Sequence, residues 1–168
     1  MSRLAFNAPM RWKPISLAAV LAAVLAALPV AGAEAPEVVG AATVIDGETL
    51  VVDGRRFRLW GIDAPDSRQS CRMRGRDYDC GRIAATALMD LVAGTRVRCR
   101  PVDGVPDAAR CYAGGYELSE GMIHTGWALA MPRDHVRFAP IEKKAAAAKR
   151  GLWRGTFEMP WDWRPASR

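Results

Sequence analysis

Two Asp-Gly pairs, at positions 46–47 and 53–54, separate three short runs that are rich in β-branched and apolar residues. The runs are Val38 to Ile45, Thr49 to Val52, and Arg55 to Leu59. Asp-Gly favours the tight turn of a β-hairpin because both central residues of that turn need a positive φ, which these residues tolerate. The pattern therefore predicts a three-stranded antiparallel meander, and the fold must be built around it.

Further elements are expected downstream of the meander. Apolar residues recur along one helical face from Gly81 to Ala93, and no periodicity is visible between Asp63 and Cys80, where we expect a long solvated loop. The remaining patterns are strands at Arg96 to Arg100, Ala109 to Tyr112 and Tyr116 to Leu118, a helix capped by Ser119 and ending at Gly126, and a helix from near Pro140 to Lys149. The order predicts a mainly β protein with helices (α+β), namely a five-stranded OB-fold barrel with three helices.

The N-terminus has the pattern of a secretory signal. Three basic residues precede an apolar run from Ile15 to Leu28, and the small residues Ala31-Gly32-Ala33 follow. A membrane anchor is the alternative, but this run of fourteen residues spans roughly 21 Å as a helix, short of a hydrocarbon core of about 30 Å. We therefore expect residues 1–33 to be a signal peptide and residues 34–168 to be one exported domain, periplasmic or secreted, without stable membrane insertion after cleavage. Removal of the signal lowers the formal charge from +6 to +3, which disfavours tight, salt-sensitive DNA binding.

The four cysteines of the chain all lie in the predicted exported domain. They are Cys71, Cys80, Cys99 and Cys111. An even number of cysteines in an oxidising compartment favours two disulfides, for which three pairings exist. We favour Cys71 with Cys80 across the loop, and Cys99 with Cys111 across neighbouring strands. A tetracysteine zinc site is the alternative, which the lack of any Cys-x-x-Cys spacing disfavours.

Four carboxylates and an arginine lie near one end of the predicted meander. Asp46 and Glu48 belong to its first turn, Asp63 and Asp66 follow its third strand, and Arg58 lies on that strand. The first turn and the end of the third strand share one edge of such a sheet, so these side chains can converge. Clustered carboxylates suit a hard cation such as Ca²⁺ or Mg²⁺, and a guanidinium matches phosphate oxygens. These are the parts that phosphodiester hydrolysis needs, although each residue could instead serve only its own turn or loop.

Two stretches carry a resemblance to a known family. The sequence ATVIDGETL at Ala42 to Leu50, followed by FRLWGIDAPD at Phe57 to Asp66, resembles the thermonuclease or staphylococcal-nuclease family of calcium-dependent nucleases. The resemblance also covers Glu117 to Ala130 and Lys149 to Trp153. It implies a five-stranded OB barrel with three helices, Ca²⁺ as cofactor, and single-stranded or unpaired DNA or RNA as substrate or ligand.

The resemblance implies a set of metal-binding residues. Asp63 matches a metal-ligating aspartate of the family, and Glu48 stands where the family has the other one. Asp46 matches a nearby carboxylate that lies outside the direct ligands, and Ala64 stands where the family contributes a metal-binding backbone carbonyl.

The resemblance also implies two catalytic residues. Arg58 matches the first phosphate-binding arginine, which helps to neutralise the transition state, and Asp66 stands where the family has the glutamate that acts on the attacking water. The exchanges at positions 48 and 66 each move a carboxylate by roughly 1.5 Å. Misplacement by about 1 Å can cost on the order of 100-fold in rate. The exchange at position 48 also predicts a weakened Ca²⁺ site.

A larger departure concerns the family's second catalytic arginine. This chain has Val102 to Pro106 in that segment, with Pro106 at the position of the arginine and no basic residue between Arg100 and Arg110. Arg110 lies about 13 Å further along a strand, too far to substitute. Loss of a transition-state arginine costs roughly 10³ to 10⁵ in rate in phosphoryl-transfer enzymes. A replacement could come from the arginines of the predicted loop: Arg72, Arg74 or Arg76.

We therefore predict an exported, monomeric thermonuclease-like protein whose metal-dependent hydrolysis of DNA or RNA is impaired. The alternative is a non-catalytic secreted OB-fold module that binds nucleic acid or a protein. An aromatic tail at about residues 154–168 bears on this choice, because exposed aromatic side chains stack on single-stranded bases. Burial preferences instead favour docking of the tail on its own domain. Its aromatic side chains, together with Trp153 before it, are Phe157, Trp161 and Trp163.

Overall fold

The computed structural model describes residues 36–132 and 135–164. The predicted signal peptide at residues 1–33 and the last four residues of the predicted tail lie outside the described residues. Within the described part of the chain, no helix is both long enough and apolar enough to cross a membrane.

The predicted meander is present, with one change in its first strand. That strand is divided into β1 (Val38–Gly40) and β2 (Ala42–Val44), of which β2 pairs with β3 (Thr49–Val52) and β3 pairs with β4 (Arg55–Leu59). Asp53 and Gly54 have φ values of 50° and 73°, as a tight hairpin turn requires. The predicted tight turn at Asp46-Gly47 was wrong, because the connection between β2 and β3 covers residues 45–48 and neither residue has a positive φ.

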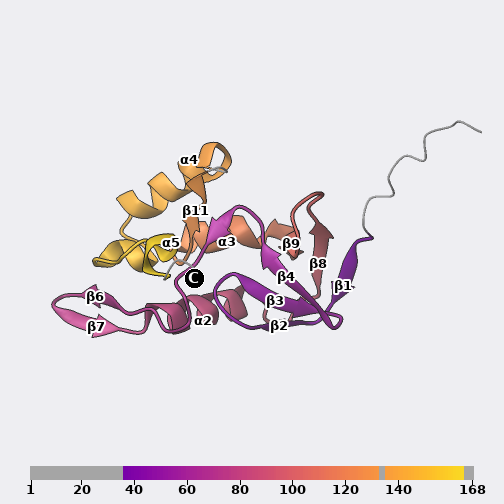
Figure 1. The fold of residues 1–168 in the computed structure, drawn as a ribbon, viewed down its shortest axis with the longest axis horizontal. Helices are drawn as coiled ribbons and strands as arrows, with labels where there is room; N and C mark the ends of the chain where they lie inside the picture. Colours follow the sequence, from indigo (N-terminus) through magenta and orange to yellow (C-terminus); the bar gives the residue numbers. More distant parts are fainter. Residues whose placement is uncertain (1–35, 133–134, 165–168) are drawn as a thin grey trace, which may run out of the picture. The chain divides into compact units, whose positions relative to one another are not determined.

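The meander continues into a mixed sheet with the order β1-β8-β9-β4-β3-β2 (Figure 1). The added strands are β8 (Val97–Pro101), β9 (Ala108–Ala113) and β10 (Tyr116–Glu117), which pairs with β9. β4 runs parallel to β9, whereas the other pairs are antiparallel. Mixed strands and helices confirm an α+β protein. The pairings of the described strands form an open path, and no closed barrel is found among them.

The segment predicted as a solvated loop is partly ordered as a hairpin. β6 (Cys71–Met73) and β7 (Arg76–Tyr78) pair with each other, and Arg74 and Gly75 turn the chain with φ values of 52° and 78°. The prediction of a structureless loop was therefore wrong. The alternation of apolar and polar residues that marks a strand was hard to recognise because arginines occupy both faces of this hairpin. The turn also begins with arginine rather than asparagine or aspartate. A second small sheet pairs β5 (Ile62–Asp63) with β11 (Leu129–Ala130).

The helices follow the predicted order with two corrections. They are α2 (Cys80–Val92), α3 (Leu118–Thr125), α4 (His135–Ala147), the 3₁₀ helix η2 (Gly151–Arg154) and α5 (Pro160–Trp163). Ser119 does not cap α3; it lies inside the helix, and its hydroxyl donates to the Trp60 carbonyl at 2.9 Å. Pro140 lies within α4 rather than at its start, because the helix already begins before Phe138, whose fully buried ring packs in the core.

Two hydrophobic clusters hold these elements together. The larger one joins the sheet to α2, α3 and α4 through buried side chains that include Leu50, Phe57, Leu88, Met122 and Phe138. The smaller one lies around a disulfide and consists of Cys71, Cys80 and Leu152, with Tyr78, Trp127 and Phe157 packed against it. The second disulfide joins Cys99 and Cys111, which face each other across β8 and β9. Both favoured pairings are therefore present.

Candidate functional site

Two buried carboxylates form the centre of the candidate site. Glu48 ends the connection between β2 and β3 and is 8% exposed, and Asp63 lies on β5 and is 2% exposed. The amide N–H of Ala64 donates to Glu48 Oε2 at 3.0 Å, which ties the first turn of the meander to the strand that carries Asp63. The predicted convergence of these two side chains is thus found.

Glycine at position 47 allows this close approach. A Cβ at Gly47 would lie 2.8 Å from the Cβ atoms of both Ala64 and Ala84. The first of these follows Asp63 directly and the second lies on α2, so the turn packs tightly against both elements. Gly47 is therefore needed for packing, whereas a positive φ is the reason for glycine at Gly54.

Arg58 projects from β4 toward both carboxylates. Its Nε donates to Glu48 Oε1 at 3.0 Å, and its Nη2 lies 3.9 Å from Asp63 Oδ1. The register explains the contact with position 48, because Arg58 pairs with Thr49 across β3 and β4. The arginine side chain remains 43% exposed, so it is accessible to a ligand.

Burial raises the pKa of Glu48 from 4.5 to about 7, and the nearby charge of Asp63 adds to the increase. Arg58, the Ala64 amide and Arg164 act in the opposite direction without cancelling it. Glu48 and Asp63 both contact Arg58. Two neighbouring buried carboxylates resist joint ionisation unless positive charge is supplied. A bound cation would favour the ionised pair, and hard divalent cations prefer such oxygen ligands.

The other predicted acidic residues have local partners. Asp46 Oδ1 accepts the amide N–H of Glu48 at 2.9 Å and so stabilises the turn. Asp66 Oδ1 accepts the amide N–H of Arg68 at 3.0 Å. Within residues 36–132 and 135–164, no group of three or more His, Cys, Asp or Glu side chains is arranged to hold a metal ion. Roles for Asp46 and Ala64 at a metal, and for Asp66 on the attacking water, therefore remain predictions.

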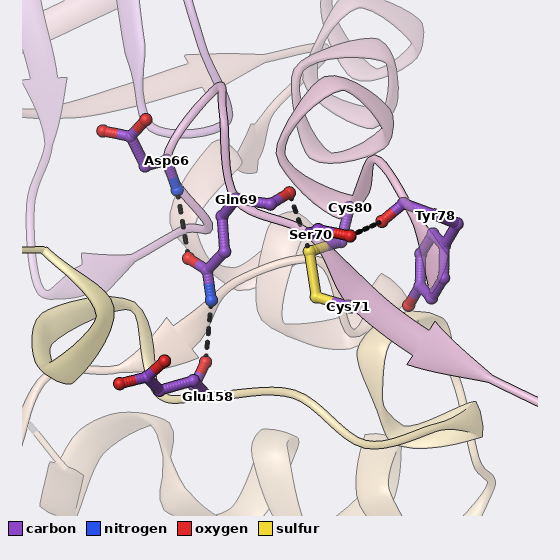
Figure 2. The surroundings of a disulfide bond; sticks show 7 residues. All are labelled: Asp66, Gln69, Ser70, Cys71, Tyr78, Cys80 and Glu158. Atoms are coloured by element: carbon purple, nitrogen blue, oxygen red, sulfur yellow. Dashed lines mark hydrogen bonds between the residues drawn. A yellow bond between two sulfur atoms is a disulfide. The ribbon is translucent and has the colours of Figure 1, made fainter. Parts of the chain in front are cut away.

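The backbone around Asp66 is fixed by a residue that the sequence patterns did not reveal. Gln69 is 1% exposed, and its Oε1 accepts the Asp66 amide N–H at 3.3 Å while its Nε2 donates to the Glu158 carbonyl at 2.8 Å (Figure 2). The start of α2 packs on the same turn, because a Cβ at Gly81 would lie 1.8 Å from the Asp66 carbonyl oxygen. The Cys71–Cys80 disulfide lies beside this contact (Figure 2). Gln69 thus joins the Asp66 turn to the C-terminal segment.

The C-terminal segment also brings an unforeseen arginine into the site. Arg164 follows α5, and its Nη2 donates to Asp63 Oδ1 while its Nη1 lies 3.6 Å from Glu48 Oε1. Its side chain is 35% exposed. Arg164 and Asp63 are 101 residues apart in sequence, and nothing in the local pattern around position 164 indicates the contact.

Two of the arginines considered from the sequence, Arg110 and Arg72, contact other groups, whereas Arg74 and Arg76 lie at the exposed turn and second strand of the β6–β7 hairpin. Arg110 lies over the Trp60 ring, 4.5 Å from its centroid, and Arg72 Nε donates to Asp77 Oδ1 at 2.9 Å. Near Pro106, the Asp107 carbonyl accepts the Arg58 amide N–H at 2.7 Å, so this segment lies beside the strand that carries Arg58 but contributes no basic side chain.

The residues present fit a divalent cation in part. Glu48 and Asp63 supply carboxylate oxygens at one buried point, where burial raises the pKa of Glu48 although Arg58 and Arg164 lower it. Mg²⁺ binds in proteins through one or two carboxylates when water and substrate phosphate supply the remaining ligands, whereas Ca²⁺ needs further oxygen ligands such as backbone carbonyls and water. Together with two guanidinium groups, such a centre could bind and polarise a phosphate ester.

Comparison with known proteins shows relatives along most of the chain. A succinoglycan biosynthesis protein, ExoI, of Rhizobium meliloti (strain 1021) is 35% identical over 147 residues, which cover 83% of this chain and 75% of that protein. Two probable staphylococcal-like nucleases of Oryza sativa subsp. japonica, CAN2 and CAN1, are 32% and 30% identical over 67% and 73% of this chain. The chain spans only 30% and 36% of the lengths of these two plant proteins. No protein-family model matches the chain.

Proposed function

The chain belongs to the staphylococcal nuclease-like family, and on that premise we propose that it hydrolyses phosphodiester bonds of DNA or RNA in a metal-dependent reaction. The observation that carries the proposal is the buried pair Glu48 and Asp63, with the exposed guanidinium of Arg58 held against it. Burial of two neighbouring carboxylates costs stability, which supports a functional role for the pair beside the structural contact that Glu48 makes with Ala64.

The proposed metal ligands are the carboxylates of Glu48 and Asp63, with the Ala64 carbonyl and water completing the set. A divalent cation bound there would supply Lewis-acid polarisation of the phosphate and charge neutralisation. Arg58 binds the non-bridging phosphate oxygens, since its outward face is open while Glu48 fixes its orientation. Asp46 keeps Glu48 in place by accepting its amide N–H.

The proposed chemical step is attack of water on phosphorus. The water oxygen forms a bond to phosphorus while the bond from phosphorus to the leaving sugar oxygen breaks. Asp66 accepts the proton of the attacking water, and the leaving oxygen takes a proton from solvent. The Asp66 turn is held by Gln69 and α2, so this base has a defined backbone position.

We expect slower hydrolysis and weaker Ca²⁺ binding than in family members that carry the usual residues at these positions. Glu48 and Asp66 each differ from the family residue by one methylene, and Pro106 replaces the second catalytic arginine. Geometric errors of about 1 Å cost on the order of 100-fold. The alternative for an impaired site is a binding module without catalysis. It keeps the same fold, and the assay below separates it from the proposal.

Export, monomeric state and a closed OB barrel belong to the same proposal. The basic and apolar pattern before residue 34 supports a cleaved signal, and the two disulfides support an oxidising compartment. N-terminal sequencing of the protein recovered from its source would test cleavage, because an intact residue 1 would contradict it.

The proposed activity is tested by incubating the purified protein with single-stranded DNA and with RNA, in Ca²⁺, in Mg²⁺ and in chelator. Wild type is expected to cleave in at least one metal and not in chelator. Asp63→Ala is expected to lose about 10³-fold or more of the rate, since it removes a proposed metal ligand. Asp90→Ala, an exposed aspartate on α2, is the matched control and should cleave normally.

Two outcomes would contradict the hydrolytic proposal. Equal cleavage by wild type and Asp63→Ala would place the activity elsewhere. No cleavage by a folded, oxidised wild type in either metal would favour the non-catalytic module, and binding of single-stranded oligonucleotide would then be measured through tryptophan fluorescence.

A further inference from the structure

We propose that Arg164 is the second phosphate-binding cation of the site and replaces the arginine that this chain lacks at Pro106. The inference rests on the proposed phosphodiester hydrolysis and adds to it a residue that lies beyond the segment resembling the family. Arg164 would bind the phosphate group of the substrate together with Arg58.

Both guanidinium groups are oriented by the same two carboxylates. Arg58 contacts Glu48 at 3.0 Å and Asp63 at 3.9 Å, whereas Arg164 contacts Asp63 more closely and lies 3.6 Å from Glu48. The carboxylate side chains are 10% and 3% exposed, but the arginine side chains are 43% and 35% exposed. The carboxylates therefore hold the guanidinium groups of Arg58 and Arg164 from the buried side. The exposed sides of the two guanidinium groups remain available to an anion. Two guanidinium groups placed in this way suit a phosphate, whose oxygens accept several N–H donors at once.

Three attachments position the segment that carries Arg164. The backbones of Arg72 and Thr156 exchange hydrogen bonds of 2.9 and 2.8 Å, which adds the segment to the β6–β7 hairpin. Gln69 Nε2 holds the Glu158 carbonyl at 2.8 Å (Figure 2). The buried Pro160 then begins α5, and its carbonyl accepts Nε of Arg164 at 3.2 Å. These contacts give the side chain a defined direction before any ligand binds, which lowers the entropic cost of binding.

An opposing explanation is that Arg164 only neutralises Asp63 until a metal displaces it. In that case removal of the guanidinium would leave phosphate binding unchanged and would make the carboxylates more available. The two explanations predict opposite effects on cleavage, so a substitution at this position separates them.

The test compares wild type, Arg164→Ala, Arg164→Lys and Arg154→Ala in saturating Ca²⁺ or Mg²⁺. Arg154 is the matched control because it is an exposed arginine at the start of the same C-terminal segment, at the end of η2. Two quantities are measured: kcat for cleavage of single-stranded DNA, and the Kd for thymidine 5′-phosphate, with thymidine as the uncharged comparison. Circular dichroism confirms that each variant is folded.

Arg164→Ala is expected to lower kcat by about 10³-fold, as loss of a transition-state arginine does in other phosphoryl-transfer enzymes. It is also expected to weaken binding of thymidine 5′-phosphate about tenfold and to leave binding of thymidine unchanged. Arg164→Lys should recover part of both losses, because the charge is kept but the planar fork is not. Arg154→Ala should match wild type.

Unchanged or faster cleavage by Arg164→Ala, with unchanged phosphate binding, would overturn the inference while the proposed hydrolysis stands. If wild type does not cleave but its binding of thymidine 5′-phosphate depends on Arg164, the hydrolysis fails and the assignment of Arg164 to phosphate is supported.

Discussion

The candidate site is made by two regions that are held in different ways. Glu48, Arg58 and Asp63 come from a continuous meander, and the hydrogen bond between Glu48 and Ala64 joins residues only 16 positions apart. Arg164 comes from the chain's C-terminal segment, 101 positions from the carboxylate it contacts. The meander is fixed by a sheet and a hydrophobic core, whereas the C-terminal segment is fixed by a few polar contacts and a small cluster around Cys71–Cys80. The proposed metal-binding carboxylates should therefore tolerate changes that displace Arg164 from the site.

The largest effect that separates the two regions is expected from Gly155→Ala. A Cβ at Gly155 would lie 2.1 Å from the Arg72 carbonyl oxygen, so the C-terminal segment must move away from the β6–β7 hairpin. We expect a loss of about 10²-fold in kcat through displacement of Arg164, with the metal-binding carboxylates unaffected. Cleavage kinetics and Ca²⁺ titration of the same variant measure the two effects.

Gly75→Ala is the control for this substitution. It strains the tip of the same hairpin, where φ is 78°, but the added Cβ meets no heavy atom within 4 Å. Cleavage by this control should stay close to that of wild type. Full activity of Gly155→Ala would show that the attachment to Arg72 does not position Arg164.

The two disulfides give a second comparison between the regions. Each closes a short loop, with sequence separations of 9 and 12, so replacing either pair by alanine should cost roughly 2.5 kcal/mol in the free energy of unfolding. Only loss of Cys71–Cys80 should also lower kcat of the folded protein, because that bridge lies in the cluster beneath the C-terminal segment. Denaturant unfolding and kinetics under conditions where each variant is folded would check this. If replacing either disulfide lowered kcat equally, the Cys71–Cys80 bridge would have no special role in positioning the C-terminal segment.

The smallest expected effect is a pH dependence that belongs to the sheet region. The pKa of Glu48 is raised from 4.5 to about 7 in the folded, metal-free protein, so the folded state binds this proton more tightly than the unfolded state. The stability that Glu48 contributes is therefore fully present below pH 4.5 and is lost as the pH rises to about 7. We expect a change of about 2 kcal/mol over this interval.

Glu48→Gln isolates that contribution, because glutamine does not titrate. The free energy of unfolding of wild type minus that of this variant, measured in chelator, should decrease as the pH rises. A difference that is constant across the interval would mean that Glu48 is not desolvated as the structure indicates. Saturating Ca²⁺ should reverse the trend, since a cation favours the ionised carboxylate.

The sequence indicated the sheet region because its signals are local. The Asp53-Gly54 turn fixed the register of β3 and β4, and that register brings Arg58 to the end of the strand beside Glu48. The favoured disulfide pairing was also predictable, because Cys99 and Cys111 lie on strands that one connection joins. By contrast, the Arg74-Gly75 turn escaped recognition, since its first residue is uncommon at a positive φ.

The remainder depends on long-range contacts that no local pattern records. Gln69 resembles an ordinary polar loop residue in the sequence, yet it is buried, accepts the Asp66 amide N–H and donates to Glu158, 89 positions further along the chain. The aromatic tail prompted a choice between base stacking and docking, and its aromatic side chains are in fact partly buried. The charged residue that follows those aromatics, Arg164, is the one that reaches the carboxylates.

The central claim is that Glu48 and Asp63 bind a divalent cation, and differential scanning calorimetry tests it without requiring activity. A ligand that binds only the folded state stabilises it by RT ln(1 + c/Kd), where c is the ligand concentration, and so raises the Tm as c exceeds Kd. We predict that Ca²⁺ raises the Tm of wild type above its value in chelator, and that Asp63→Asn abolishes the rise. An equal rise in both proteins, or no rise in wild type at saturating Ca²⁺, would contradict the account.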